Sequence, residues 1–387
     1  MLEPLAVTLF WGAAAFVLYV YAGYPALLCL WARVRPREIR TDGAADPVGV
    51  TIILAARDEA HRLRMRLDNL LELDHPAALR QIVVVSDGST DGTEAVVAGY
   101  GSLVDFVAIP AGGKAVALNA AVERARFDVL IFADARQLFA PDAIAELTRP
   151  LSDPHIGAVS GELVLDCESG WRRSRTEDRR ASARHRADRR QQRPSAIAAG
   201  VGAYWRYEKA LRRLESTVGS MLGATGAIYA LRRSLWRPLP AGTILDDVLG
   251  PMRVVLDGRR IVFNPRARAF DWAAPDASVE AARKTRTLTG NYQMLWLEPR
   301  LLLPWRNPVW LQFVSHKIAR LLVPAALVLL LASNFVLAPR PFYLATLLAQ
   351  CGFYLLAAYG AWLERRERLV AAPAPQVPAG AKEAVNA

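Results

Sequence analysis

Three stretches of the chain are long, apolar and free of charged residues. They cover residues 4–32, 321–339 and 341–363. Because about 20 apolar residues are enough to cross a bilayer as a helix, we expect a transmembrane helix over 4–32 and a transmembrane hairpin over 318–363. Basic residues follow the first stretch, precede the second and follow the third. Since such flanks favour the cytoplasmic side, the pattern predicts a multi-pass protein of the inner (plasma) membrane with a cytoplasmic domain between the spans.

Between the spans, short β-rich apolar runs alternate with segments of helical spacing. Strands are predicted at 48–54, 81–85, 105–109 and 129–132, and helices at 59–73, 91–98 and 114–124. Strands that alternate with helices build doubly wound, mostly parallel sheets. The pattern therefore predicts an α/β domain over residues 48–294.

Three further segments differ from this pattern. Residues 295–316 mix Trp and Leu with Arg, Glu and three prolines, which suits either a segment in the lipid headgroup region or a helical pair under the domain. Residues 171–193 are rich in Arg and lack apolar periodicity, which indicates a disordered insertion. The Ala- and Pro-rich residues 371–387 are predicted to be a disordered tail.

Charge and cysteine usage exclude several classes of function. The net charge is +11, but residues 171–193 hold ten Arg against three acidic residues, a net of +7 that leaves +4 elsewhere. A nucleic-acid-binding protein is therefore the weakest interpretation. The three cysteines form neither a CxxC motif nor a zinc quartet. No GxxxxGK[ST] is present, and no GxGxxG follows the first predicted strand, which argues against nucleoside triphosphatases and nicotinamide enzymes.

Polar residues follow each of the four predicted strands. They are residues 57–59, 86–92, 112–114 and 134–136. Taken alone, residues 86–92 read as an ordinary turn and helix cap. In open α/β sheets, however, ligands bind beyond the carboxyl ends of the strands. Four such ends on one edge predict a site with carboxylates and one Lys for a polar, phosphate-bearing ligand.

Seven segments together resemble a known family. They are AARDEA (55–60), VVVSDGSTDGT (83–93), GGKAVALNAA (112–121), FADAR (132–136), GATGAIYALRR (223–233), ILDDV (244–248) and RKTRTLTGNYQ (283–293). In this order, between apolar spans, they are similar to the membrane-bound inverting glycosyltransferases of family 2, which include polysaccharide synthases. The resemblance implies a GT-A fold, in which a nucleotide-diphospho-sugar donates its sugar to a glycan or lipid-linked acceptor.

The resemblance also implies roles for single residues. The donor would be bound by Ala55, Glu59, Asp87, Lys114 and Asp134, the acceptor side or the diphosphate would be contacted by Gly223, Thr225, Asp246 and Arg286, and the general base would be Asp247. Inverting transfer needs a carboxylate that takes the acceptor proton and positive charge that offsets the leaving diphosphate.

The chain departs from the family pattern at two places. Arg136 replaces the second carboxylate of the Asp-x-Asp motif, so Mg²⁺ or Mn²⁺ would be held through Asp134 with another carboxylate serving, or Arg136 would offset the phosphate charge directly. The segment at 283–287 keeps Arg286 but lacks the aromatic residue of processive synthases, which leaves processive and single transfer open. Two alternatives remain, a polyprenyl-phosphate sugar transferase and a catalytically degenerate carbohydrate-binding or scaffold protein of the membrane.

Overall fold

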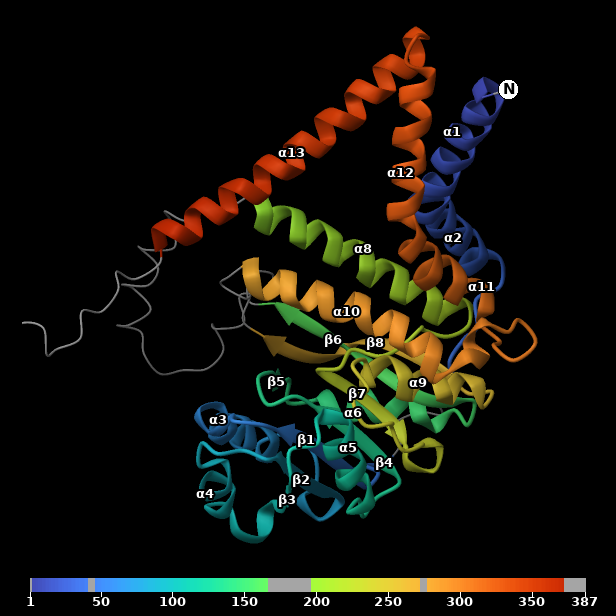
Figure 1. The fold of residues 1–387 in the computed structure, drawn as a ribbon. Coiled ribbons are helices and arrows are strands. Elements are labelled where there is room, and N and C mark those ends of the chain that lie inside the picture. Colours follow the sequence, from blue (N-terminus) through green and yellow to red (C-terminus); the bar gives the residue numbers. More distant parts are fainter. Residues whose placement is uncertain (1, 41–45, 166–195, 272–276, 372–387) are drawn as a thin grey trace, which may run out of the picture. The chain divides into compact units, whose positions relative to one another are not determined.

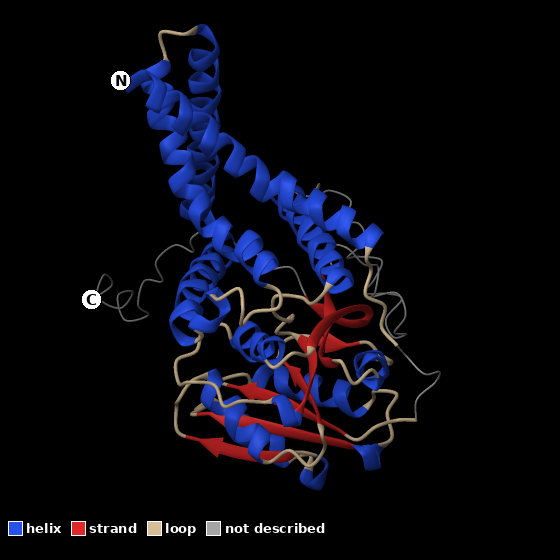
Figure 2. Ribbon diagram, turned by 90° about the vertical axis from the view of Figure 1, so that its right-hand side faces the viewer, coloured by secondary structure: helices blue, strands red, loops and turns tan. Residues whose placement is uncertain are grey.

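The computed structural model describes residues 2–40, 46–165, 196–271 and 277–371. The chain divides into two compact units, one formed by residues 20–321 and the other by residues 1–19 with 322–387. The larger unit contains the sheet (Figures 1 and 2). The predicted insertion at 171–193 lies outside the described residues, and so does the predicted tail at 371–387 apart from Ala371.

One eight-stranded sheet forms the centre of the larger unit, in the order β3-β2-β1-β4-β7-β6-β8-β5. Its strands are β1 (Val50–Ala56), β2 (Arg80–Asp87), β3 (Asp105–Ile109), β4 (Val129–Ala133), β5 (Leu138–Phe139), β6 (Ile156–Leu165), β7 (Ile228–Arg232) and β8 (Arg260–Asp271). The first four are parallel neighbours. They correspond to the four predicted strands, with ends that differ by at most two residues.

Helices cover both faces of the parallel half. Because side chains alternate along a strand, Ile53 and Val83 pack against α5 (Lys114–Glu123), whereas Ile52 packs against α3 (Ala60–Leu71) on the opposite face. These strand residues are almost completely buried. Burial on both faces explains why the strands read as continuous apolar runs in the sequence.

The second half of the sheet is mixed. Strand β7 runs antiparallel to both β4 and β6, β6 is parallel to β8, and β5 is antiparallel to β8. The further helices of this unit that bear on the site are α4 (Thr93–Ala98), α6 (Ala143–Thr148), α8 (Ala196–Val218), α9 (Asp246–Leu256), α10 (Ala277–Leu297) and α11 (Trp310–Phe313). Helix α8 packs on β8 (Figure 1).

Three helical segments are long and apolar enough to cross a membrane, namely Leu2–Val34, Trp310–Leu337 and Pro341–Leu363. The first contains α1 (Leu2–Leu18), a π-helical turn (Tyr19–Gly23) and α2 (Tyr24–Val34). The second contains α12 (Ala319–Leu337), and the third is the greater part of α13 (Pro341–Ala371). Within the smaller unit, Asn334 of α12 donates a hydrogen bond to Gln350 (3.1 Å) and accepts one from Thr346 (2.8 Å), both on α13. These bonds satisfy polar groups that lipid leaves without partners.

The segment at 295–316 has two different sides. It includes a 3₁₀ turn (Pro299–Leu302) and α11. Leu301 and Phe313 are fully buried in the core of the larger unit, as a helical pair under the domain requires. Trp296 and Trp305 are 89% and 74% exposed, as a segment in the headgroup region requires. The segment therefore has a buried side and an exposed side, and its place in the headgroup region stays a prediction.

Candidate active site

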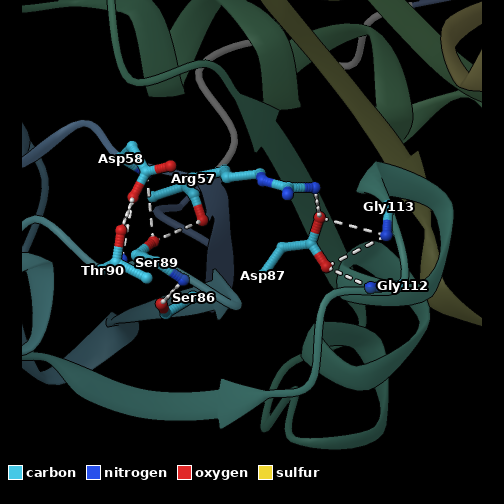
Figure 3. Close-up of polar contacts among 9 residues, drawn as sticks. Arg57, Asp58, Ser86, Asp87, Ser89, Thr90, Gly112 and Gly113 are labelled. Atoms are coloured by element: carbon cyan, nitrogen blue, oxygen red, sulfur yellow. Dashed lines mark hydrogen bonds and ion pairs between the residues drawn. The ribbon is translucent and has the colours of Figure 1, made fainter.

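The carboxylate of Asp87 closes the carboxyl end of β2 (Figure 3). Its Oδ1 accepts hydrogen bonds from the backbone N–H groups of Gly112 (2.6 Å) and Gly113 (3.0 Å), and Gly113 also donates to Oδ2 (3.0 Å). The guanidinium of Arg57, beyond β1, lies 3.8 Å from Oδ2. The ends of β1, β2 and β3 therefore meet at one buried carboxylate, as the strand-end pattern predicted.

The loops after β1 and β2 are also tied together (Figure 3). Asp58 adopts a left-handed backbone conformation, with φ of 52°, and its Oδ1 accepts a hydrogen bond from the N–H of Thr90 (2.8 Å). Gly88 has φ of +65°, and a Cβ there would lie 2.8 Å from the Cβ of Ala111. Only glycine therefore allows the β2 loop to pass so close to the loop after β3.

Lys114, the first residue of α5, joins carboxylates from two distant elements. Its Nζ lies 3.1 Å from Oδ1 of Asp134, after β4, and 3.2 Å from Oδ2 of Asp246, the first residue of α9. Burial alone would lower the pKa of Lys114, but Asp134, Asp246 and Asp247 together raise it well above its ordinary value. Lys114 is therefore a fixed cation, one residue away from the Gly113 amide that binds Asp87.

Asp247 lies in the first turn of α9 and faces a loop of small residues. Its Oδ2 accepts a hydrogen bond from the N–H of Gly226 (3.2 Å), and its carbonyl oxygen accepts one from Ala224 (2.8 Å). A Cβ at Gly226 would lie 2.9 Å from Oδ2, so a larger residue would displace the carboxylate. Burial, followed by the charge of Asp246, raises the pKa of Asp247 to about 6, and the charge of Lys114 limits the rise. A carboxylate of this pKa suits proton transfer near neutral pH.

One residue of this cluster was not predicted from the sequence. Tyr229 of β7 is buried, its ring stacks on Phe132 of β4, and its hydroxyl has no hydrogen-bond partner among the described residues. Burial raises its pKa well above the ordinary value, and Asp246, Asp247 and Asp134 raise it further. The only signal in the sequence is its position after the small-residue loop, in the segment GATGAIYALRR.

The acceptor-side residues lie on both sides of Asp247 in the sequence. Thr225 is buried, and its N–H donates to Oγ of Ser160 on β6 (2.9 Å). Gly223 has φ of +136° in the same loop. Arg286 of α10 is exposed and donates to the carbonyl of Ile244 (3.3 Å), two residues before Asp246. The geometry therefore brings the 223–226 loop, the start of α9 and α10 together.

Two of the predicted donor residues lie on β1 and the start of α3. Ala55 is the penultimate residue of β1 and is partly buried. The carboxylate of Glu59 accepts a hydrogen bond from Arg62 (3.2 Å), one turn along α3. Within the part of the chain that the structure describes, Glu59 forms no ion pair with Lys114. Glu59 therefore lies at the margin of the candidate site, and its carboxylate pairs with Arg62 of α3.

Arg136, at the second position of the Asp-x-Asp motif, is engaged elsewhere. Its Nε donates to Oδ2 of Asp271 at the end of β8 (3.1 Å), and its Nη2 contacts the same oxygen. Gln137 donates to that oxygen as well (2.9 Å). The guanidinium is thus occupied by a buried carboxylate, which differs from the expectation that Arg136 offsets phosphate charge.

The carboxylates around Lys114 do not form a metal site as they are arranged. Within residues 2–40, 46–165, 196–271 and 277–371, no group of three or more His, Cys, Asp or Glu is placed to hold a metal ion. The Lys114 ammonium lies between Asp134 and Asp246, where a cation shared by the two would have to lie. Because Mg²⁺ and Mn²⁺ need several oxygen ligands, this arrangement does not fit a metal held through Asp134.

Comparisons with known proteins agree on the class of protein. Residues 51–213 match the family model described as glycosyl transferase family 2. The poly-beta-1,6-N-acetyl-D-glucosamine synthase of Staphylococcus aureus (strain COL) is 30% identical over 117 residues, and that of Staphylococcus epidermidis is 27% identical over the same length. Each alignment covers 29% of this chain and 28% of the relative, so the chain matches less than a third of the length of these relatives.

A solved structure supplies the comparison of folds. A mannosyltransferase from Pyrobaculum calidifontis, in complex with GDP-Man and Mn2+, has a TM-score of 0.67 at 22% identity, with 96% of this chain and 97% of that chain covered. At this identity the likeness shows the fold, which is shared along nearly the whole chain. Residues 51–213 therefore match glycosyl transferase family 2, and the chain has a GT-A fold.

Proposed function

We propose that the protein is a membrane-bound inverting glycosyltransferase that moves a sugar from a nucleotide-diphospho-sugar to a hydroxyl of a glycan or lipid-linked acceptor, in polysaccharide synthesis. The observation that carries the proposal is the partly buried Asp247, whose pKa of about 6 suits a base that lies beside the Lys114 cluster. The names of the staphylococcal synthases and the P. calidifontis mannosyltransferase support a sugar donor of this class.

The proposed reaction is a single displacement. The acceptor hydroxyl gives its proton to the carboxylate of Asp247, and its oxygen forms a bond to the anomeric carbon of the sugar. The bond between that carbon and the phosphate oxygen breaks on the opposite face, so the nucleoside diphosphate leaves with the bonding electrons and the configuration inverts. Atoms and charge balance, because the proton remains on Asp247 and the negative charge passes to the diphosphate.

The donor is assigned to the edge formed by β1, β2 and β3. Asp87 would accept hydrogen bonds from the base or ribose, beside Ala55 and Glu59. Asp134 would lie near the ribose, and the ammonium of Lys114 would offset the charge that develops on the diphosphate. Positive charge held in advance at the leaving group lowers the barrier without reorganisation.

A divalent cation is supported by one comparison and opposed by the local arrangement. The P. calidifontis complex holds Mn2+ together with its nucleotide sugar. In this chain Lys114 lies between the two carboxylates, and Arg136 is paired with Asp271. We therefore propose a reaction without a metal ion, in which Lys114 exchanges a carboxylate partner for the diphosphate when the donor binds.

The protein is assigned to the inner (plasma) membrane, with the domain at 48–294 in the cytoplasm. Three apolar helical segments and their basic flanks support this orientation. The exposed side chains of Trp296 and Trp305 would lie at the headgroups, where Trp is enriched.

The proposal is tested by replacing the base. Asp247→Asn should lower release of nucleoside diphosphate from a nucleotide sugar by about 100-fold or more, with donor binding nearly unchanged, because the amide keeps the shape but takes no proton. The matched control is Asp257→Asn at the other end of α9, where Asp257 pairs with Arg237. Turnover that survives in Asp247→Asn would show that another group is the base. A wild type that binds nucleotide sugars without turnover would favour the carbohydrate-binding alternative.

A further inference from the structure

A layer of charged side chains lies between α8 on one side and, on the other, the π-helical turn Val314–Ile318 with the first turn of α12. It consists of Glu208, Arg212 and Glu215 on α8 and of His316, Lys317 and Arg320 in residues 316–320, and we call it the charged seam. The three α8 residues are spaced by four and three positions, so they lie on one face of the helix.

The two carboxylates of the charged seam are already satisfied. Glu208 pairs with Arg320 and lies 3.4 Å from Nε2 of His316. Glu215 contacts Nδ1 of His316 (2.6 Å) and accepts a hydrogen bond from the hydroxyl of Tyr24 on α2 (2.8 Å). Both carboxylates are therefore bound to groups other than Arg212 and Lys317.

Within the described part of the chain, two cations of the charged seam form no ion pair with a carboxylate. Arg212 donates to Oγ1 of Thr225 (3.0 Å), which is a neutral partner. Lys317 is partly buried and, within the described part of the chain, has no hydrogen bond or ion pair. The charged seam holds two carboxylates and three basic side chains, before any proton on His316 is counted. The charges of Glu208, Glu215 and Asp247 act on Lys317 without a direct ion pair among the described residues, so an anion bound beside it would stabilise it further.

The excess charge lies on the acceptor side of the proposed base. Thr225, which binds Arg212, precedes Gly226, whose N–H donates to Asp247. Lys317 is close enough that its charge lowers the pKa of Asp247. The donor diphosphate is assigned to Lys114, the first residue of α5. Arg212 and Lys317 can therefore hold a different anion.

We propose that Arg212 and Lys317 bind a phosphate group of the acceptor, and that the acceptor is a phosphate-bearing lipid whose hydroxyl reaches Asp247. This inference rests on the proposed transferase function. Arg with Lys is a combination that binds phosphate well. The lipid part is argued from position, because Lys317 lies inside the apolar segment Trp310–Leu337 and Tyr24 lies inside Leu2–Val34. Ionisable residues within membrane-spanning segments commonly mark a substrate path.

The test compares two probes that differ only in phosphate. The full-length protein in detergent is titrated with farnesyl phosphate and with farnesol, and binding is followed by thermal unfolding and calorimetry. Wild type should bind farnesyl phosphate about tenfold or more tightly than farnesol, and Lys317→Met and Arg212→Met should each remove most of that difference. Lys317→Arg should retain it, because the charge is kept. Arg306→Met, which removes an exposed charge from the same segment of the chain, before α11, should leave it unchanged.

Two further arms separate the possible sources of the anion. Nucleoside diphosphate (UDP and GDP) should bind Lys317→Met as tightly as wild type, and inorganic phosphate should give a much smaller shift than farnesyl phosphate. Equal binding of farnesyl phosphate and farnesol, or loss of nucleoside diphosphate binding in Lys317→Met, would overturn the proposal. These binding measurements do not require turnover. A failure of the proposed transferase function would be seen separately, because the wild type would then release no nucleoside diphosphate from a nucleotide sugar.

Discussion

The raised pKa of Asp247 predicts how the reaction depends on pH. A general base acts only when it is deprotonated, so the rate should rise with pH through about 6 and level off above it, with about a tenfold loss for each pH unit below. Asp246→Asn removes the second cause of the raised pKa, the neighbouring negative charge, and should move the midpoint to lower pH. A pH–rate profile of donor hydrolysis measures both. A midpoint that stays in place in Asp246→Asn would contradict the assignment of the titration to Asp247.

The same pKa makes a prediction about stability. Because the folded pKa of Asp247 lies above its ordinary value of 3.8, the folded state favours the protonated carboxyl, and its contribution to the free energy of unfolding is lost as pH rises through about 6. Asp247→Asn, which stays neutral, should therefore raise the melting temperature relative to wild type more at about pH 8 than at about pH 5. Thermal unfolding at the two pH values checks this. An equal rise in melting temperature at the two pH values would show that the negative charge of Asp247 does not destabilise the folded state.

The hydroxyl oxygen of Tyr229 allows a second test of the cluster, because one substitution removes that atom alone. Its hydroxyl is buried without a partner among the described residues, and removal of an unsatisfied buried group is neutral or stabilising. Tyr229→Phe, which keeps the stacking on Phe132, should therefore unfold at the same or a higher temperature. Tyr229→Ala should cost about 3–5 kcal/mol through the cavity it leaves. A large loss of stability in Tyr229→Phe would reveal a hydrogen bond of this hydroxyl.

Between elements, the pair of Arg136 and Asp271 fixes the turn after β4 to the end of β8. Arg136→Asp restores the sequence of the Asp-x-Asp motif but leaves the buried Asp271 opposite a second carboxylate. Breaking a buried ion pair in this way costs about 3–5 kcal/mol, whereas removing both charges is far less costly. Arg136→Gln combined with Asp271→Asn should therefore be more stable than Arg136→Asp alone, as denaturant unfolding can measure. Equal stability of the two would show that the pair contributes little.

The elements near the start of the domain could be predicted from the sequence, because each signal there is local. Fully buried parallel strands read as apolar runs, and the polar residues at their ends, such as Asp87 and Lys114, stand at fixed places in the chain. The antiparallel strands and the pairing of Lys114 with Asp246 could not be predicted, since that contact joins positions far apart in the sequence. The partner of Arg136 was missed for the same reason, and Tyr229 because an aromatic residue in a strand usually signals core packing.

For the whole molecule, the three apolar segments and their basic flanks predict an orientation of the chain in the membrane that can be measured. The turn between α12 and α13 would face away from the cytoplasm, while α4 would face it. In a chain whose native cysteines are replaced by alanine, we expect a membrane-impermeant maleimide to label Pro339→Cys in intact cells and to label Glu94→Cys only after lysis. Both positions are exposed, so access and not burial decides the result. Labelling of Glu94→Cys in intact cells would place the Asp247 site on the side without nucleotide sugars and would remove the basis of the proposed transfer.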